Sequence, residues 1–329
     1  MQIFFDGNVW NSFKDMLLHQ KRTLAFMISV DWFQPFKHCT YSIGAIYLVI
    51  VNLPRNERYK RENVILAGLI PPLETEPNTL NSFLSPLVSD LKELWKGVRL
   101  YTSESPRYKV LVRGALICAA CDIPAARKLC GFKAHNANRG CSKCFKWFSG
   151  PVTNKDYSGF DREKWLLRDI TAHRQYAAQI KEAKTAQEKS SLETQHGIYY
   201  SILLKLDYFN PIRNCIVDPM HNLFLGTAKR FFKKIWIPHG ILKEKQLKEI
   251  QARVDSVAVP STIGRIPKKI ATAFGGFTAE QWMNWTLVYS LYALRGLIAE
   301  EHYRCWETFV IACRLLSQPV LSDTDIKKS

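Results

Sequence analysis

The chain has 329 residues, 47% of them apolar, which is enough for a sizeable core and, by length alone, for about two domains. Its 46 Lys and Arg against 29 Asp and Glu give a net charge of +17, which favours polyanionic partners such as nucleic acid. Nine cysteines in a chain of this size, with neither a signal peptide nor an apolar run of about 18 residues, argue against a secreted disulfide scaffold or a membrane protein. We therefore expect a reducing compartment.

The first part of the chain predicts a sheet. Four stretches rich in aliphatic and β-branched residues predict buried strands: residues 24–31, 41–53, 63–70 and 110–122. Leucines at three- and four-residue spacing predict a helix over residues 79–95, which we expect Pro86 to break or restart. A short helix is predicted over residues 125–129. The order β-β-β-α-β-α is the one that an RNase H-like core requires, although other α/β folds also alternate such elements.

Two aspartates, Asp31 and Asp122, each end one of these apolar runs. A carboxylate at the end of a core strand is costly to desolvate unless a positive group meets it. Two of them from separate strands indicate a shared site for a divalent cation, because Mg²⁺ prefers oxygen ligands. The alternative is that each Asp caps a turn just outside its strand.

From about residue 140 to 260 the sequence becomes charged and favours helices. We therefore expect three parts: residues 1–139 as the first part of the core, residues 140–260 as an inserted, mostly helical region, and residues 261–329 as the return to the core. In the third part a long helix is predicted over residues 278–298. Thr278 and Gln281 fit a capping box at its start.

Glu280, in the first turn of that helix, is the candidate for a third carboxylate. The metal chemistry would need two divalent ions about 4 Å apart, bridged by carboxylates and flanked by Lys and Arg that position the DNA backbone. The alternative is that Glu280 only complements the helix dipole, since Glu is favoured in first turns for that reason alone.

Cys141 and Cys144 have the CxxC spacing of half a zinc site. The candidates for the two further ligands are Cys130, His135, His173, Cys215 and His221. Of these we favour His173 and His221. The alternative is a pair of reduced, packed cysteines.

Asp218 and His221 lie three residues apart before an amphipathic stretch over residues 222–236. Both side chains could face one site at a helix start. The alternative is an ordinary helix opening, with Asp218 as the N-cap and Pro219 in the first turn.

Taken together in chain order, seven segments resemble the transposases of the CACTA (En/Spm) superfamily, and the resemblance covers roughly residues 5–300. They are Asp31–Phe36, Asn52–Arg55, Leu87–Gly97, Cys121–Ala125, Gly131–Cys144, Asp218–Asn222 and Gly276–Trp285.

The resemblance implies an RNase H-like DDE/D enzyme of the nucleus that cuts element ends and joins them to target DNA with Mg²⁺ or Mn²⁺. Asp31 matches the first aspartate and Asp122 the second, and Glu280 matches the third acidic position. Cys141 with Cys144 matches the CxxC of the superfamily, and Asp218 with His221 matches its D-x-x-H motif. Homo-oligomers are also a family expectation.

The leading hypothesis is therefore a metal-dependent DNA transposase or endonuclease core. The alternative is an inactive or host-adopted nucleic-acid-binding protein derived from one, and a third option is a structural zinc protein. A complete transposase of this kind is expected to carry more chain on either side, which would make this sequence a fragment, a degraded copy or an adopted core.

Overall fold

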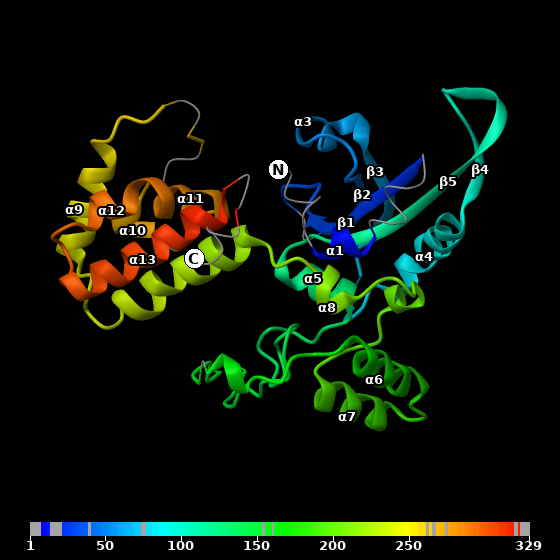
Figure 1. Cartoon of the computed structure of the whole chain (residues 1–329). Helices are drawn as coiled ribbons and strands as arrows, with labels where there is room; N and C mark the ends of the chain where they lie inside the picture. The colour runs from blue at the N-terminus through cyan, green and yellow to red at the C-terminus, as the bar shows by residue number, and fades with distance from the viewer. Residues whose placement is uncertain are drawn as a thin grey trace. The chain divides into compact units, whose positions relative to one another are not determined.

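The computed structural model of the chain describes residues 8–13, 22–38, 41–73, 77–152, 155–159, 161–260, 263–264, 268–273, 276–318 and 322. The chain divides into two compact units (Figure 1), of which the first extends to Ile216 and the second begins at Val217. The first unit contains a sheet with helices, and the second contains helices. The predicted boundaries at residues 139 and 260, with an insertion between them, stay a prediction.

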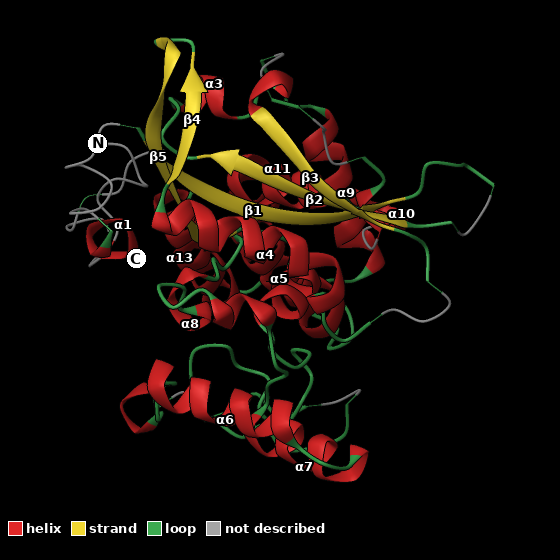
Figure 2. Cartoon of the chain, turned by 90° about the vertical axis from the view of Figure 1, so that its right-hand side faces the viewer, coloured by secondary structure: helices red, strands yellow, loops and turns green. Residues whose placement is uncertain are grey.

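A mixed five-stranded sheet forms the centre of the first unit (Figure 2). Its strands are β1 (Thr23–Phe33), β2 (Ile43–Ile50), β3 (Val64–Ile70), β4 (Val98–Thr102) and β5 (Ser105–Ala119). The spatial order is β3-β2-β1-β5-β4. β1 runs parallel to β5, and the other neighbouring strands are antiparallel.

The four predicted strands are confirmed, but several of their ends differ: β2 is shorter than predicted at both ends, and β5 begins at Ser105 instead of Val110. β1 continues past Asp31 to Phe33, and β5 ends at Ala119 instead of Asp122. β4 was not predicted. It is short and mostly exposed, so it lacks the apolar run by which the other strands were recognised.

The central strand β1 is buried on both faces, which explains why its sequence is continuously apolar instead of alternating. Phe26, Ile28 and Val30 belong to the core on one face, and Ala25 and Met27 belong to the core on the other. Trp10 of α1 (Asn8–Ser12) packs into the second of these cores.

Helices α4 (Asn81–Lys96) and α5 (Ile123–Cys130) contribute to the core on the first face. The prediction that Pro86 breaks or restarts the first helix was wrong, because α4 is continuous across it. Pro86 is exposed, whereas Leu84, Val88 and Leu91 are fully buried. The burial of these side chains outweighs the cost of one missing backbone hydrogen bond.

Among the described residues, the rest of the first unit consists of loops, short 3₁₀ turns, the one-turn helix α3 (Arg55–Arg58) and three further helices. The helices are α6 (Ile170–Glu182), α7 (Ala186–His196) and α8 (Pro211–Asn214). Side chains cap all three: Asp169, Thr185 and Asn210 each accept from a backbone N–H of the following turn. No residue of α7 is buried, so it is a solvated helix.

The second unit is helical and is built around aromatic side chains. Its segments are η4 (Met220–Ala228), η5 (Phe231–Trp236), α9 (Glu244–Asp255), α10 (Ile270–Ala273), α11 (Ala279–Asn284), η7 (Trp285–Tyr289), α12 (Ser290–Leu294) and α13 (Glu300–Leu316). The ring of Phe232 lies between 4.7 and 5.8 Å, centroid to centroid, from those of Trp236, Trp282, Trp285 and Trp306.

The capping box of Thr278 and Gln281 is confirmed at the start of α11. The predicted helix over residues 278–298 is shorter, because α11, η7 and α12 together end at Leu294. The chain leaves the helix at Arg295, and Gly296 follows with φ +73°, a conformation that suits glycine, in a turn closed by the N–H of Leu297 donating to the carbonyl of Leu294 at 3.0 Å.

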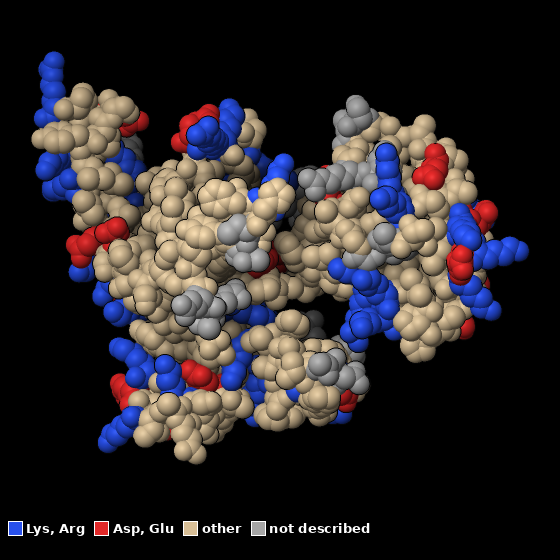
Figure 3. Space-filling view, turned by 180° about the vertical axis from the view of Figure 1, so that it is seen from behind, with Lys and Arg blue, Asp and Glu red and all other residues tan. Residues whose placement is uncertain are grey.

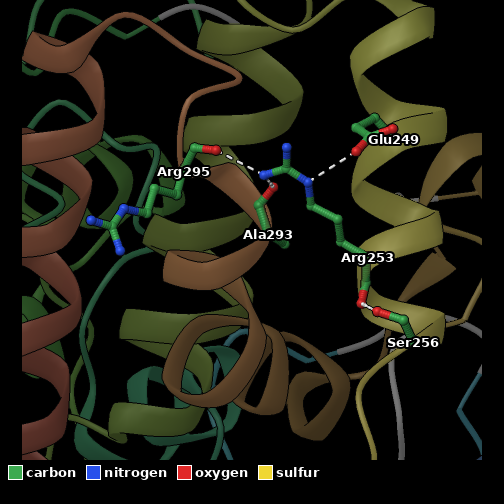
Figure 4. A network of polar contacts seen from close by, with 5 residues as sticks. All are labelled: Glu249, Arg253, Ser256, Ala293 and Arg295. Carbon is green, nitrogen blue, oxygen red and sulfur yellow. Dashed lines mark hydrogen bonds and ion pairs between the residues drawn. The ribbon is translucent and has the colours of Figure 1, made fainter.

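Arg253 of α9 connects that helix to the end of α12 (Figure 4). Its guanidinium donates to the carbonyl oxygens of Arg295 (2.7 Å) and Ala293 (3.4 Å), and it also pairs with Glu249 at 3.1 Å. The last carbonyls of a helix have no partner inside the helix, so Arg253 satisfies groups that would otherwise need water.

Candidate functional site

The register of β1 and β5 brings the backbones of Asp31 and Asp122 to the same edge of the sheet. The two parallel strands pair Ile28 with Ala119, and the backbone N–H of Ala120 donates to the carbonyl of Ile28 at 2.9 Å. The N–H of Val30 then lies 3.2 Å from Sγ of Cys121, which accepts it. Asp31 follows Val30 and Asp122 follows Cys121, so both aspartates lie at the same edge of the sheet.

Asp31 is exposed, and its side chain points away from α4 and α5. Val30, the residue before it, faces the core beneath these helices, and successive side chains of a strand point to opposite faces. Among the residues that the structure describes, none hydrogen-bonds or pairs with the Asp31 carboxylate. The turn-capping alternative does not apply to Asp31, because it lies inside β1 and pairs with Ala45 of β2.

Asp122 has a structural role as a helix cap. Its Oδ1 accepts from the backbone N–H of Ala125 at 2.7 Å, which makes it the N-cap of α5, with Pro124 in the first turn. The turn-capping interpretation is therefore confirmed for this residue. Capping occupies one carboxylate oxygen and leaves Oδ2 able to bind a cation.

Trp32 borders a pocket of about 320 Å³ at the same end of β1. The other lining residues are Ser42, Ile70, Pro71, Leu73 and Pro77. Nζ of Lys128, on α5, lies 5.4 Å from the centre of the Trp32 ring. The pocket therefore lies on the α5 side of the sheet, the face opposite to the Asp31 side chain.

Cys141 and Cys144 lie in the loop between α5 and α6 and are close to each other. Burial raises the pKa of the Cys144 thiol, and its contact with Cys141 acts in the same direction. Arg168 fixes the loop by donating to the carbonyls of Cys141 and His196, each at 2.9 Å. Burial lowers the pKa of Arg168 to about 10.

His173 of α6 is fully buried, and burial, aided by Arg168 and Arg174, lowers its pKa to about 4. Neither ring nitrogen has a hydrogen-bond partner within the described residues, and the ring lies 5.5 Å from that of Phe132. The imidazole is therefore neutral at physiological pH, the form that can bind a metal.

Two of the other candidate ligands, Cys130 and Cys215, pair with each other instead. Their thiols share a hydrogen bond, which raises the pKa of Cys130 well above its ordinary value and lowers that of Cys215. Burial further raises the pKa of Cys130, and nearby Lys143 lowers that of Cys215.

Asp218 and His221 form a contact within the second unit. Oδ1 of Asp218 accepts from the backbone N–H of Met220 at 2.9 Å, and Oδ2 contacts Nδ1 of His221. Asp218 therefore caps the helix start and also orients the imidazole, so that its two predicted roles coexist. Both side chains are partly exposed.

Glu280 lies in the first turn of α11, as predicted, and its carboxylate packs against the backbone of Gly264. Glu280 and His221 belong to the second unit, whereas Asp31, Asp122 and the CxxC cysteines belong to the first. Within the described residues, no group of three or more His, Cys, Asp or Glu side chains is arranged so that it could hold a metal ion.

A comparison with protein families decides the affiliation of the chain. Residues 3–200 match the model of the transposase family tnp2, which spans more than half of the chain. The chain belongs to this transposase family. No curated protein matches it.

The match of this tnp2 transposase to its family covers Asp31, Asp122, Cys141, Cys144 and His173. Asp218, His221 and Glu280 lie outside the matched residues. Family membership makes DNA the partner of the protein. None of the helices in the described ranges is long and apolar enough to cross a membrane.

The sequence interpretation missed the basic side chains of β4 and of the first half of β5 in this transposase. Arg99 lies on β4, and Arg107, Lys109 and Arg113 lie at alternating or near-alternating positions of β5. Basic residues at every second position can indicate an exposed strand. The strand was predicted only from Val110 onward, where the apolar run begins.

Proposed function

We propose that this tnp2 transposase is a DDE/D enzyme of the CACTA (En/Spm) type that cuts and joins DNA, with Asp31 and Asp122 as metal-binding carboxylates. One observation carries the proposal: the register of β1 and β5 brings the backbones of the two aspartates to one edge of the sheet, and the hydrogen bonds of the described chain use one of the four carboxylate oxygens, Oδ1 of Asp122.

The strand arrangement supports an RNase H-like core. An antiparallel β3-β2-β1 meander continues into β5, parallel to β1, after the crossover helix α4. This connection brings the carboxyl ends of β1 and β5 to one edge, where ligands of α/β sheets commonly bind.

The residues fit a hard divalent cation, because carboxylate oxygens are the ligands that Mg²⁺ and Mn²⁺ prefer. When bound, such an ion would supply Lewis-acid stabilisation of the phosphodiester and lower the pKa of an attacking water or hydroxyl. Asp31, which is exposed, would hold the ion on the open side. Asp122 would be held in position by its bond to the N–H of Ala125.

Three further features belong to the same proposal. The third carboxylate of such an enzyme, predicted from the sequence to be Glu280, stays a prediction because Glu280 belongs to the second unit; the enzyme would act in the nucleus, and it would work as a homo-oligomer. They derive from the resemblance to CACTA transposases.

Zinc binding by Cys141 and Cys144, with His173 as a further ligand, also remains a proposal, whereas the predicted ligand His221 belongs to the second unit. The neutral His173, with both buried nitrogens unpartnered in the described chain, supports it, whereas nearby Arg168 and Arg174 oppose a cation. Metal analysis of the purified protein and of Cys141→Ser/Cys144→Ser would decide: an unchanged zinc content would rule these cysteines out.

The decisive experiment compares Asp31→Asn and Asp122→Asn with the control Asp169→Asn in a Mg²⁺- or Mn²⁺-dependent nicking assay. Asp169 caps α6 as Asp122 caps α5: its Oδ2 accepts from the backbone N–H of Ala172, with 2.9 Å between nitrogen and oxygen. Because Asn caps a helix about as well as Asp, neither capping variant should lose stability. We expect Asp31→Asn and Asp122→Asn to lose at least about 100-fold in rate through loss of metal binding, and Asp169→Asn to keep its rate.

Equal activity of Asp122→Asn and wild type would remove the proposed site. DNA binding by the wild-type protein without any nicking would instead favour the alternative, an inactive DNA-binding protein derived from a transposase.

A further inference from the structure

The β4–β5 hairpin extends beyond the other strands of the sheet (Figure 1). β4 is the edge strand, and β5 pairs with it through Val98–Val112, Arg99–Leu111 and Leu100–Val110. Large apolar side chains on the hairpin remain exposed: Tyr101 by 62%, Tyr108 by 65%, and Leu100 and Leu111 by more than 40% each.

One face of this hairpin collects basic side chains. Arg99 lies opposite Leu111, and Lys109 and Arg113 flank Leu111 at two-residue spacing, so all three basic residues share its face. Nζ of Lys109 lies 5.5 Å from the centre of the Tyr101 ring, which places that ring on the same face. Val110 and Val112, on the opposite face, are buried. We call Arg99, Tyr101, Lys109 and Arg113 the basic face.

The negative charge of the hairpin does not cancel this basic face. Glu104, the acidic residue of the turn, pairs with Arg22 at 3.4 Å. Lys and Arg side chains gather at the margins of the projecting part at the upper left of Figure 3, where the hairpin lies in that view. The hairpin therefore presents cations and an aromatic ring to solvent.

We infer that the basic face of the β4–β5 hairpin binds the backbone of double-stranded DNA. A two-stranded ribbon fits a DNA groove, and Lys and Arg contact phosphates without regard to sequence. The charge of the face matches this polyanion. The inference rests on the proposed function in taking DNA as the substrate, but it does not depend on Asp31 or Asp122.

Protection of an edge strand is the competing explanation, because charged side chains on edge strands also prevent pairing between sheets. It predicts that neutralising the hairpin causes self-association and leaves DNA affinity unchanged. The two explanations therefore differ in what a neutral hairpin does.

The test uses the full chain and a duplex of about 30 base pairs, with affinity measured over a range of salt concentrations. Arg99→Gln/Lys109→Gln removes two exposed charges from the basic face. The matched control, Lys184→Gln/Lys189→Gln, removes two exposed charges from the α6–α7 part of the same unit. A second variant, Arg99→Lys/Lys109→Arg, keeps the charge.

We expect Arg99→Gln/Lys109→Gln to bind duplex DNA roughly tenfold more weakly and to lower the salt slope by about two, one for each phosphate contact. The control and the charge-keeping variant should bind within about twofold of wild type, since neither removes a phosphate contact. Thermal melting and light scattering of each variant exclude unfolding and association as causes.

Equal losses in the two neutralised pairs, or no loss in either, would overturn the inference, as would a wild-type chain that does not bind duplex DNA. Asp122→Asn separates this result from the proposed function. If Asp122→Asn binds DNA normally but does not nick it, the hairpin inference and the catalytic proposal both stand. If the wild type binds DNA through the hairpin and never nicks it, only the catalytic proposal fails.

Discussion

Asp31 and Asp122 show how one residue type takes two roles after similar apolar runs. Asp122 follows a strand that has already ended, so its carboxylate can turn to the first N–H groups of α5. Asp31 remains inside a strand, where its backbone pairs with β2 and its side chain has only solvent to meet in the described chain. The proposed metal site therefore combines a positioned carboxylate with an open one.

Burial of thiols also has a measurable consequence at this scale. Burial raises the pKa of Cys118 to about 12, and the effect of neighbouring Arg58 is too small to reverse it. The unfolded chain releases the thiol proton near pH 9, whereas the folded chain retains it. Stability is therefore fully present below pH 9 and is lost as the pH rises toward 12.

We predict that the free energy of unfolding falls between pH 7 and pH 10 by about 1.4 kcal/mol more in the wild type than in Cys118→Ala, because the variant lacks this thiol. Urea unfolding at the two pH values measures the difference. Cys305→Ala, which removes an exposed thiol, is the control and should follow the wild type. Identical pH dependence in Cys118→Ala and wild type would show that Cys118 ionises normally in the folded chain.

At the scale of elements, Arg253 and Arg304 look alike in sequence but differ in structure. Each follows a Glu by four residues on a helix and pairs with it, at 3.1 Å for Arg253 and 2.8 Å for Arg304. Only Arg253 also donates to the carbonyls of Ala293 and Arg295 at the end of α12. The side chain of Arg304 is 75% exposed, compared with 27% for Arg253.

We predict that Arg253→Ala lowers the free energy of unfolding by about 1–3 kcal/mol, because carbonyls at a helix end lose a charged donor. Arg304→Ala should cost less than about 0.5 kcal/mol, as exposed ion pairs contribute little. Chemical denaturation of both variants tests the pair, and equal costs would mean that the carbonyl contacts contribute nothing.

At the scale of the whole molecule, the buried apolar residues form cores that stay within each unit. Leu84 belongs to the core of the sheet unit and Leu294 to the aromatic core of the helical unit, and both are fully buried. Truncation of either side chain leaves a cavity.

We predict that Leu84→Ala and Leu294→Ala each cost about 2–5 kcal/mol locally. Hydrogen exchange measured by mass spectrometry should show faster exchange within residues 23–130 for the first variant and within residues 217–316 for the second. Because the two substitutions are chemically identical, each serves as the control for the other. Loss of protection throughout the chain in both would show that the two units unfold as one.

Elements whose stability comes from a continuous apolar surface were predictable from the amino-acid pattern alone. The four buried strands, the helix with Leu84, Val88 and Leu91, and the capping box at Thr278 could all be predicted, because these patterns involve residues close together in the chain. The sequence also indicated a transposase, and the family match over residues 3–200 agrees.

Features that depend on residues far apart in the chain could be seen only in the folded protein. The register of β1 against β5 brings the backbones of Asp31 and Asp122 to one edge of the sheet, although the two residues lie 91 positions apart. The exposed strand β4 has too few apolar residues to be recognised alone, and its basic face exists only because β5 pairs with it. Pro86 remains inside α4 because core packing outweighs a local preference. Strand pairing and side-chain burial are long-range free energies, so a local pattern can indicate an element but cannot select its partner.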